Sequence, residues 1–339
     1  MKITGIVEDG TGANSRLARR EPPGFLDALG YRPHLGTLNL RVTRRDRGRV
    51  LKLPGKKVSG TLFWRAELNG TVCHVQLSRD YNTLELVHPE RLRDTYSNGD
   101  RVELEITARR MKLSAAIMAH PVREENAKRV QTSLDRNVPI IFDENPEPSA
   151  DPLQRWTTGH RCWEAHDPDA DYHLVLQDDV SVSIGLLEGL ENALTQLGPE
   201  GLMSAYTGTG RPDQKNVLRA HAHATEHGHT WMTTKSLNWG PAIIAPVSTI
   251  PDMLEWCEQW IPRKTPPASN YDKAIGLFYR DQMGYRTWYT VPSLVQTGNL
   301  PSLIGHDYGP KRMAHSFYPG DARHIDWSLV PYRGLNPYW

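Results

Sequence analysis

The pattern of apolar and polar positions changes character near residue 110. Before this point, turn sequences such as LNG and SNGD separate short segments that alternate between apolar and polar residues: KITGIVED, GTLNLRVT, TLFWRAEL, TVCHVQLS, NTLELVHP and DRVELEIT. Alternation with a period of two is typical of strands that bury one face. The segment 1–109 is therefore predicted to be an antiparallel β-barrel or sandwich.

Beyond residue 110, continuous apolar runs predict strands in KLSAAIMA, VPIIFDE and YHLVLQDD. Two segments of helical composition lie between them, REENAKRVQTSLDR and DPLQRWTTGHRCWEAH. Buried strands that alternate with helices indicate parallel βαβ units. A chain of 339 residues is long enough for two domains. We therefore expect an α+β two-domain protein, with a small β-barrel at 1–109 and a Rossmann-like α/β domain at 110–339.

The two parts carry opposite charge. Residues 1–110 contain 20 Lys and Arg against 13 Asp and Glu, and the remainder contains 20 against 26. A basic first part is compatible with an anionic ligand, and equally with docking of the first part on the acidic second part.

Cysteine usage and hydropathy bear on localisation. Cys73, Cys162 and Cys257 are too few and too scattered for a disulfide framework, which predicts reduced thiols in a cytoplasmic protein. No apolar run suits a signal peptide or a membrane span.

Two polar features lie in the first part. Thr37 and Asn39 alternate with Leu38 and Leu40, so in a strand both would face one side, where their oxygens could hold Mg²⁺ or simply be solvated. Upstream, the glycine-containing loop GTGANSR could turn backbone amides toward an anion, or could be a hairpin turn.

Residues 1 to about 108 resemble the archaeal CTP-dependent riboflavin kinases, which are small cradle-loop barrels. The resemblance lies in GTGANSR, LGYRPHLGTLNLRV and SRDYNTLELVHPERLRDTYSNGDRVELEI, which follow the order of the family. It implies that Thr37 and Asn39 ligate Mg²⁺ on the phosphates of CTP, that Glu85 is a candidate general base, and that the phosphates are lined by Gly10, Gly12 and Arg16.

In the second part, the apolar strand of YHLVLQDDV delivers Asp178 and Asp179 at its carboxyl end, where ligands bind in open α/β sheets. Two adjacent carboxylates suit Mg²⁺ or Mn²⁺ carrying a diphosphate. An acidic N-cap for the helix in SIGLLEGLENALTQL would explain the same residues.

Residues 111 to about 307 resemble the GT-A glycosyltransferases, especially those with a LEDDV-like metal motif, although Gln177 replaces an acid. The resemblance implies a nucleotide-sugar donor, a hydroxyl acceptor, and a metal held by Asp178 and Asp179. It also implies nucleotide contacts in the loop that contains His120 and Arg123, an acceptor side at Trp239 and Gly240, Asp272 as a candidate base, and a late metal ligand at either His306 or Gln296.

The tract HAHATEHGH contains His221, His223, His227 and His229, which invite a zinc interpretation. Because the tract lacks a Cys partner or a His-Glu-x-x-His helix, and is polar with a glycine, a loop over the site is the favoured interpretation.

Three functional hypotheses follow. The first is a nucleotide-sugar-dependent glycosyltransferase whose barrel binds nucleotide or acceptor, and the second is a bifunctional enzyme whose barrel is also a CTP-dependent kinase. The third makes the barrel a non-catalytic ligand or nucleic-acid module, helped by the basic run at 44–57, although interleaved aromatic residues for base stacking are missing there. A nucleotide or DNA acceptor would fit a nucleotide-binding neighbour.

Overall fold

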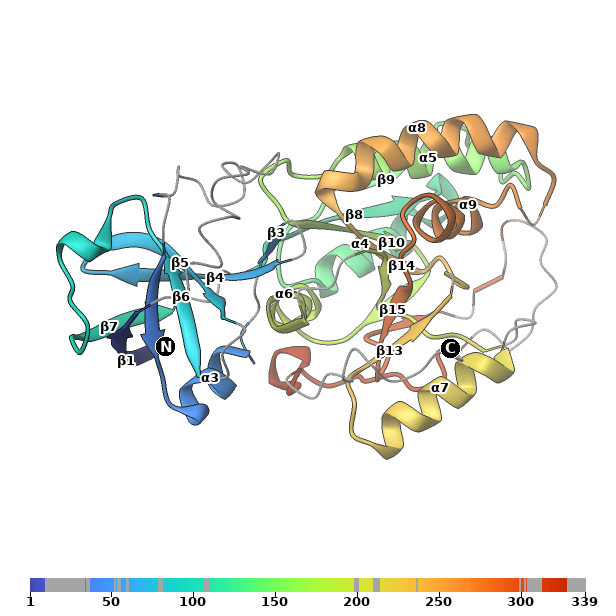
Figure 1. Ribbon diagram of the computed structural model, residues 1–339. Helices are drawn as coiled ribbons and strands as arrows, with labels where there is room; N and C mark the ends of the chain where they lie inside the picture. Colours follow the sequence, from blue (N-terminus) through green and yellow to red (C-terminus); the bar gives the residue numbers. More distant parts are fainter. Residues whose placement is uncertain are drawn as a thin grey trace. The chain divides into compact units, whose positions relative to one another are not determined.

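The computed structural model divides the chain into two compact units, Met1–Arg110 and Met111–Trp339 (Figure 1). The structure describes the whole chain apart from residues 10–33, 35–36, 52, 54–55, 59–60, 79–81, 107–109, 198–200, 210–213, 236, 267, 299, 302, 304–312 and 328–339.

The first unit is a closed six-stranded antiparallel barrel. Its strands follow one another around the barrel as β4 (Thr61–Leu68), β5 (Thr71–Leu77), β6 (Thr83–Val87), β2 (Leu38–Arg41), β1 (Lys2–Glu8) and β7 (Arg101–Ile106). The ring closes because β7 pairs with both β1 and β4. A short strand, β3 (Lys56–Val58), also pairs with β4. Of the two architectures predicted for this segment, the barrel is therefore confirmed.

Alternating side chains of these strands build the barrel core. In β7, Val102, Leu104 and Ile106 are buried, whereas the residues between them are exposed. The six strands correspond to the six alternating segments of the sequence. The helix α3 (Arg44–Leu51) lies within the basic run and was not predicted, since only Val50 in it is buried.

The second unit contains a seven-stranded mixed sheet. Its order is β13 (Trp231–Thr234), β15 (Thr287–Thr290), β12 (Met203–Ser204), β14 (Ala242–Pro246), β10 (Tyr172–Gln177), β8 (Leu113–Ala119) and β9 (Ile140–Phe142). The three strands β8, β9 and β10 are parallel, as predicted. The expectation of parallel pairing does not extend across the sheet, because β14 runs antiparallel to both β10 and β12.

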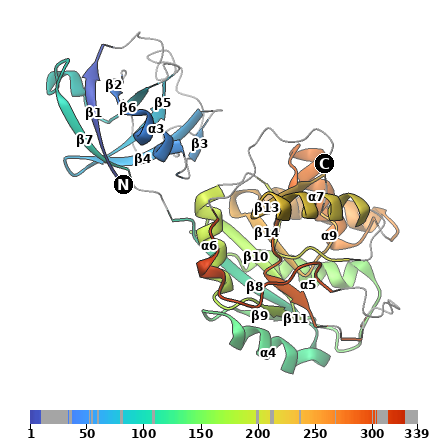
Figure 2. The same ribbon diagram turned by 90° about the horizontal axis from the view of Figure 1, so that it is seen from below.

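Helices cover this sheet on both faces. In Figure 1, α5 (Pro152–Glu164) and α8 (Ile250–Trp260) lie above it, and α6 (Leu186–Leu197) and α7 (Gln214–Glu226) lie below. Helices α4 (Glu124–Ser133) and α9 (Tyr271–Leu277) belong to the same unit (Figure 2), and a small two-stranded ribbon pairs β11 (Val180–Val182) with β16 (Val295–Thr297). Within the described residues, no helix is long and apolar enough to cross a membrane.

The histidine tract does not form a loop. Residues 221–226 belong to α7, which buries Val217, Ala220, His221 and Ala224 along one face. This spacing of three and four residues is that of an amphipathic helix. The loop expectation was wrong because the buried positions within the tract are His221 and Ala224 rather than large apolar residues.

Candidate functional site

The carboxyl end of β10 brings the two predicted metal-ligating carboxylates to the edge of the sheet. β10 ends at Gln177 and β11 begins at Val180, so Asp178 and Asp179 form the turn between the main sheet and the β11–β16 ribbon. Asp178 is buried, and the Asp179 side chain is 21% exposed. The backbone amide of Gly298, just after β16, donates to the carbonyl of Asp179.

The adjacent strand β8 ends beside these carboxylates. After β8 the chain continues to β9, which lies on one side of the β8–β10 pair. After β10 it continues to β12 and β14, which lie on the other side of the pair. In open α/β sheets such a reversal is where ligands are expected to bind, in a crevice outside the carboxyl ends of the two strands. The backbone amide of His120, which directly follows β8, donates to Oδ2 of Asp178 at 2.9 Å. The predicted nucleotide loop and the predicted metal ligands therefore lie together.

Arg123 neutralises part of the negative charge in this crevice. Its Nη1 lies 3.2 Å from Oδ1 of Asp178 and 3.3 Å from Oδ2 of Asp179. Its Nη2 donates to the backbone carbonyl of Pro301. Arg123 was expected to contact a nucleotide, and the structure places its guanidinium directly against the two carboxylates.

Burial dominates the electrostatics of Asp178. It raises the pKa of the Asp178 carboxyl, and the amide of His120 and the charge of Arg123 oppose this rise only in part. In Asp179, Oδ1 is buried and has no hydrogen-bond partner among the described residues. A buried carboxylate oxygen without a partner is costly unless a ligand satisfies it. The pair therefore offers the hard oxygen donors that Mg²⁺ and Mn²⁺ prefer.

The predicted acceptor-side residues lie beside the last residue of β10. Nε2 of Gln177 donates to the hydroxyl of Tyr271 at 2.6 Å, and this hydroxyl donates in turn to the carbonyl of Gly240 at 3.5 Å. A β-carbon at Gly240 would lie 3.3 Å from Cβ of Asp272. Gly240 and Asp272 are therefore neighbours beside Gln177, the last residue of β10. Sequence reasoning missed Tyr271, whose only signal is its place next to Asp272.

The other predicted residues of this unit have different surroundings. Trp239 is buried against Tyr206 and Tyr289, and its Nε1 has no hydrogen-bond partner among the described residues. Oε1 of Gln296 accepts hydrogen bonds from the backbone amides of Thr297 and Ala314. His306 lies outside the described residues.

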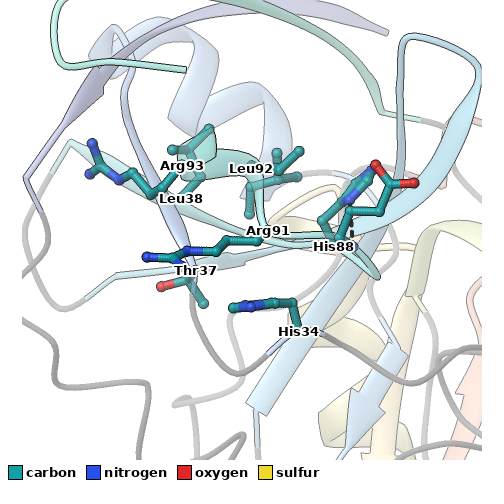
Figure 3. Close-up of a pocket in the computed structure, with 9 residues that line it drawn as sticks. His34, Thr37, Leu38, His88, Arg91, Leu92 and Arg93 are labelled. Atoms are coloured by element: carbon teal, nitrogen blue, oxygen red, sulfur yellow. Dashed lines mark hydrogen bonds between the residues drawn. The ribbon is translucent and has the colours of Figure 1, made fainter. Parts of the chain in front are cut away.

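A second candidate site is a pocket of about 350 Å³ at one end of the barrel (Figure 3). Its lining is rich in basic and imidazole groups: His34, Thr37, Leu38, Leu86, His88, Glu90, Arg91, Leu92 and Arg93. Figure 3 shows the side chain of Arg91 extended alongside Thr37. Among the described residues, Arg91 forms an ion pair with an exposed carboxylate, that of Asp94, at 3.5 Å. Such an exposed pair contributes little, so the guanidinium is available to an anion.

Two other groups of the pocket are held by hydrogen bonds. Arg93 donates to Oδ1 of Asn98 at 2.6 Å and to the carbonyl of Glu8. Nδ1 of His88 accepts from the amide of Glu90 at 3.0 Å, so a neutral His88 carries its proton on Nε2. Burial lowers the pKa of His88, which favours this neutral form.

The predicted kinase residues are divided between this pocket and a buried polar row. Thr37 lines the pocket, whereas Asn39 pairs in register with Glu85, which in turn pairs with Gln76. Nε2 of Gln76 donates to Oε2 of Glu85 at 2.8 Å, and Oδ1 of Asn39 is buried with no hydrogen-bond partner in the described part of the chain. Gly10, Gly12 and Arg16 lie outside the described residues.

Comparisons with known proteins add little to these sites. The sequence matches no family model, and no curated protein is similar to it at a significant level. Among solved structures, the chain is similar to a glycosyltransferase involved in the glycosylation of the major capsid of PBCV-1. The two are 12% identical, the match covers 50% of this chain and 75% of the other, and the TM-score is 0.26. A likeness this weak carries no argument, and the function has to be inferred from the residues themselves.

Proposed function

We propose that this chain is a metal-dependent glycosyltransferase that moves a sugar from a nucleotide-sugar donor to a hydroxyl acceptor. The observation that carries the proposal is the position of Asp178 and Asp179 at the carboxyl end of β10, in the crevice beside the end of β8. One of their oxygens is buried without a partner among the described residues. A divalent cation bound there would stabilise the departing diphosphate as a Lewis acid.

The chain's own residues have separate roles in this proposal. Asp178 and Asp179 hold the cation, and His120 fixes the orientation of Asp178 through its backbone amide. Arg123 supplies a second positive charge within reach of the diphosphate. Asp272, next to Gly240, orients the acceptor hydroxyl. Transfer breaks the bond between the sugar and the diphosphate and forms one to the acceptor oxygen, whose proton Asp272 accepts if the anomeric centre inverts.

The test is a titration of the full chain with UDP-sugars and GDP-sugars in the presence of Mg²⁺ or Mn²⁺, followed by assays of sugar transfer or donor hydrolysis. Asp179→Asn should lose metal-dependent donor binding, whereas Asp272→Asn should bind the donor and fail to turn it over. Asp281→Asn is the matched control, because Asp281 pairs with Arg280 on the surface. If wild type binds no sugar nucleotide with either metal, the proposal is wrong.

The barrel pocket supports a second proposal, which is binding of a nucleotide such as CTP. Arg91, Thr37 and His34 line a pocket suited to phosphate oxygens. Phosphoryl transfer by the barrel would further need Mg²⁺ on Thr37 and Asn39 and a base at Glu85. A non-catalytic barrel would need only the binding pocket.

Binding and turnover separate these two alternatives. Arg91→Ala should weaken CTP binding, and Arg101→Ala, an exposed arginine on β7, is its control. If Glu85→Gln abolishes phosphorylation of riboflavin or another hydroxyl substrate without loss of CTP binding, the barrel is a kinase. Equal CTP affinity in wild type and Arg91→Ala would contradict the role given to the pocket.

A further inference from the structure

The C-terminal end of α7 places three potential metal ligands on one face. His223, Glu226 and His227 each offer one ligand atom, and these atoms lie within 4.8 Å of one another. Residues at positions i, i+3 and i+4 share a helix face, and the imidazole rings of His223 and His227 have centroids 4.1 Å apart. All three side chains are exposed, so small rotamer changes can bring their ligand atoms together.

The turn after the helix adds a fourth group. The amide of His229 donates to the carbonyl of Ala224, and the amide of Gly228 donates to that of Thr225. These two bonds, with Gly228 at a φ of +66°, form a Schellman motif, which reverses the chain at the helix end. As a result, the ring of His229 stacks 5.9 Å from that of His227, with 10° between their planes.

Backbone contacts also select the ligating nitrogen of one histidine. Nδ1 of His227 lies 2.9 Å from the carbonyl oxygen of His223, which can only accept a hydrogen bond. Nδ1 therefore carries the proton, and the lone pair of the neutral ring lies on Nε2. Histidines that bind metals are oriented in this way by a carbonyl or carboxylate on the other nitrogen.

We propose that His223, Glu226 and His227 bind a divalent transition-metal cation of the Zn²⁺ class, and that the neighbouring His229 completes its coordination. Imidazole nitrogens with one carboxylate suit Zn²⁺ and not Mg²⁺, which prefers oxygen ligands. The site lies in a different segment from Asp178 and Asp179 and does not depend on the proposed transferase activity. A bound cation would link the last turn of α7 to the segment that enters β13.

The experiment is calorimetric titration of the untagged full chain with Zn²⁺ and, separately, with Mg²⁺. We expect Zn²⁺ binding that is weakened at least about tenfold in His223→Ala and in His227→Ala, because each variant removes a direct ligand. Glu226→Gln should weaken Zn²⁺ binding as well. His229→Ala tests the fourth ligand, and we expect it to weaken Zn²⁺ binding less than His227→Ala does.

Two controls distinguish this site from others in the chain. His160→Ala removes another helical histidine, which pairs with the carboxylate of Glu164 four residues later in the chain. This variant should leave Zn²⁺ binding unchanged. Asp252→Asn, which removes an exposed carboxylate in the first turn of α8, should also leave it unchanged. The proposal is overturned if a double variant of His223 and His227 binds Zn²⁺ as wild type does, or if wild type shows no Zn²⁺ binding.

Discussion

The guanidinium of Arg123, at the end of β8, reaches the carboxylate of Asp178, at the end of β10, with 3.2 Å between Nη1 and Oδ1. Both side chains are nearly buried, with 11% and 8% of their surfaces exposed. Because the same nitrogen also reaches Asp179, a single positive charge faces two negative ones. A divalent cation at the carboxylates would have to share this position with Arg123 or displace it.

Removal of Arg123 should make the unit less stable and more dependent on metal. In Arg123→Ala, two adjacent carboxylates lose their positive partner, which should cost about 3 kcal/mol of unfolding free energy. Mn²⁺ would then restore more stability than it gives wild type, because no arginine competes with it. Thermal unfolding with and without Mn²⁺ measures both effects. Arg129→Ala, on the exposed side of α4, is the control. If Mn²⁺ raises the unfolding temperature equally in wild type and in Arg123→Ala, Arg123 does not compete with the cation.

Asp178→Asn should separate stability from ligand binding. Burial raises the pKa of Asp178, so keeping its carboxylate charged lowers the stability of the folded protein. This loss of stability is absent at pH values below the pKa, where the carboxyl is protonated. At neutral pH the neutral variant should therefore be no less stable than wild type, and the two should converge in stability as the pH falls. Metal-dependent donor binding should nevertheless be lost. Urea unfolding at several pH values, combined with donor titration, tests this pair of outcomes.

His173 should make stability depend on mildly acidic pH. It donates from Nε2 to the carbonyl of Cys162 and accepts at Nδ1 from the hydroxyl of Ser114. Burial lowers the pKa of His173 from 6.5 to about 4. Between these values the unfolded chain binds a proton that the folded chain does not, so stability falls as the pH falls, by about 1.4 kcal/mol per pH unit.

Urea unfolding between pH 7 and pH 4.5 measures this slope. In His173→Gln it should be smaller than in wild type, although the variant should be less stable at pH 7. His160→Gln, which removes a partly exposed histidine, provides the comparison. A slope that His173→Gln leaves unchanged would assign the effect to other groups.

Gly240→Ala should disturb the acceptor side of the crevice. The added β-carbon would lie 2.9 Å from the hydroxyl of Tyr271, which is buried and hydrogen-bonded to Gln177. We expect a loss of about 1–3 kcal/mol, which is typical of an overpacked core, and a raised KM for the acceptor. Gly48→Ala is a matched control, since nothing lies within 4 Å of a β-carbon there and Gly48 lies within helix α3. That substitution should stabilise the protein by about 0.5–1 kcal/mol.

The sequence predicted those elements whose burial follows a simple period. In β7, every second residue is apolar, and β8 and β10 are continuous apolar runs, so their existence and type could be read directly. The helix α3 could not be read in this way, because its two large apolar residues, Val50 and Leu51, are adjacent at its end and half of its positions are arginine. The antiparallel direction of β14 could not be predicted either, since the direction of a strand depends on the path that the chain takes between strands.

The candidate site was predicted as a set of residues but not as a set of contacts. Asp178 and Asp179 could be found because they end an apolar strand, and Asp272 and Gly240 because their segments resemble those of a known family. No sequence pattern shows that Arg123 reaches across two strands to both carboxylates, or that Tyr271 connects Gln177 to Gly240. Such contacts depend on which strands become neighbours in the sheet.

The closure of the barrel has a consequence for synthesis on the ribosome. β1 is made first, yet one of its two neighbours in the barrel is β7, at Arg101–Ile106. Until β7 emerges, β1 and β4 each keep an open edge, and open edges recruit other strands. A nascent chain stalled before Arg101 should therefore be cleaved by proteases and should self-associate. A chain that extends beyond Ile106, with β7 outside the exit tunnel, should be protected from both.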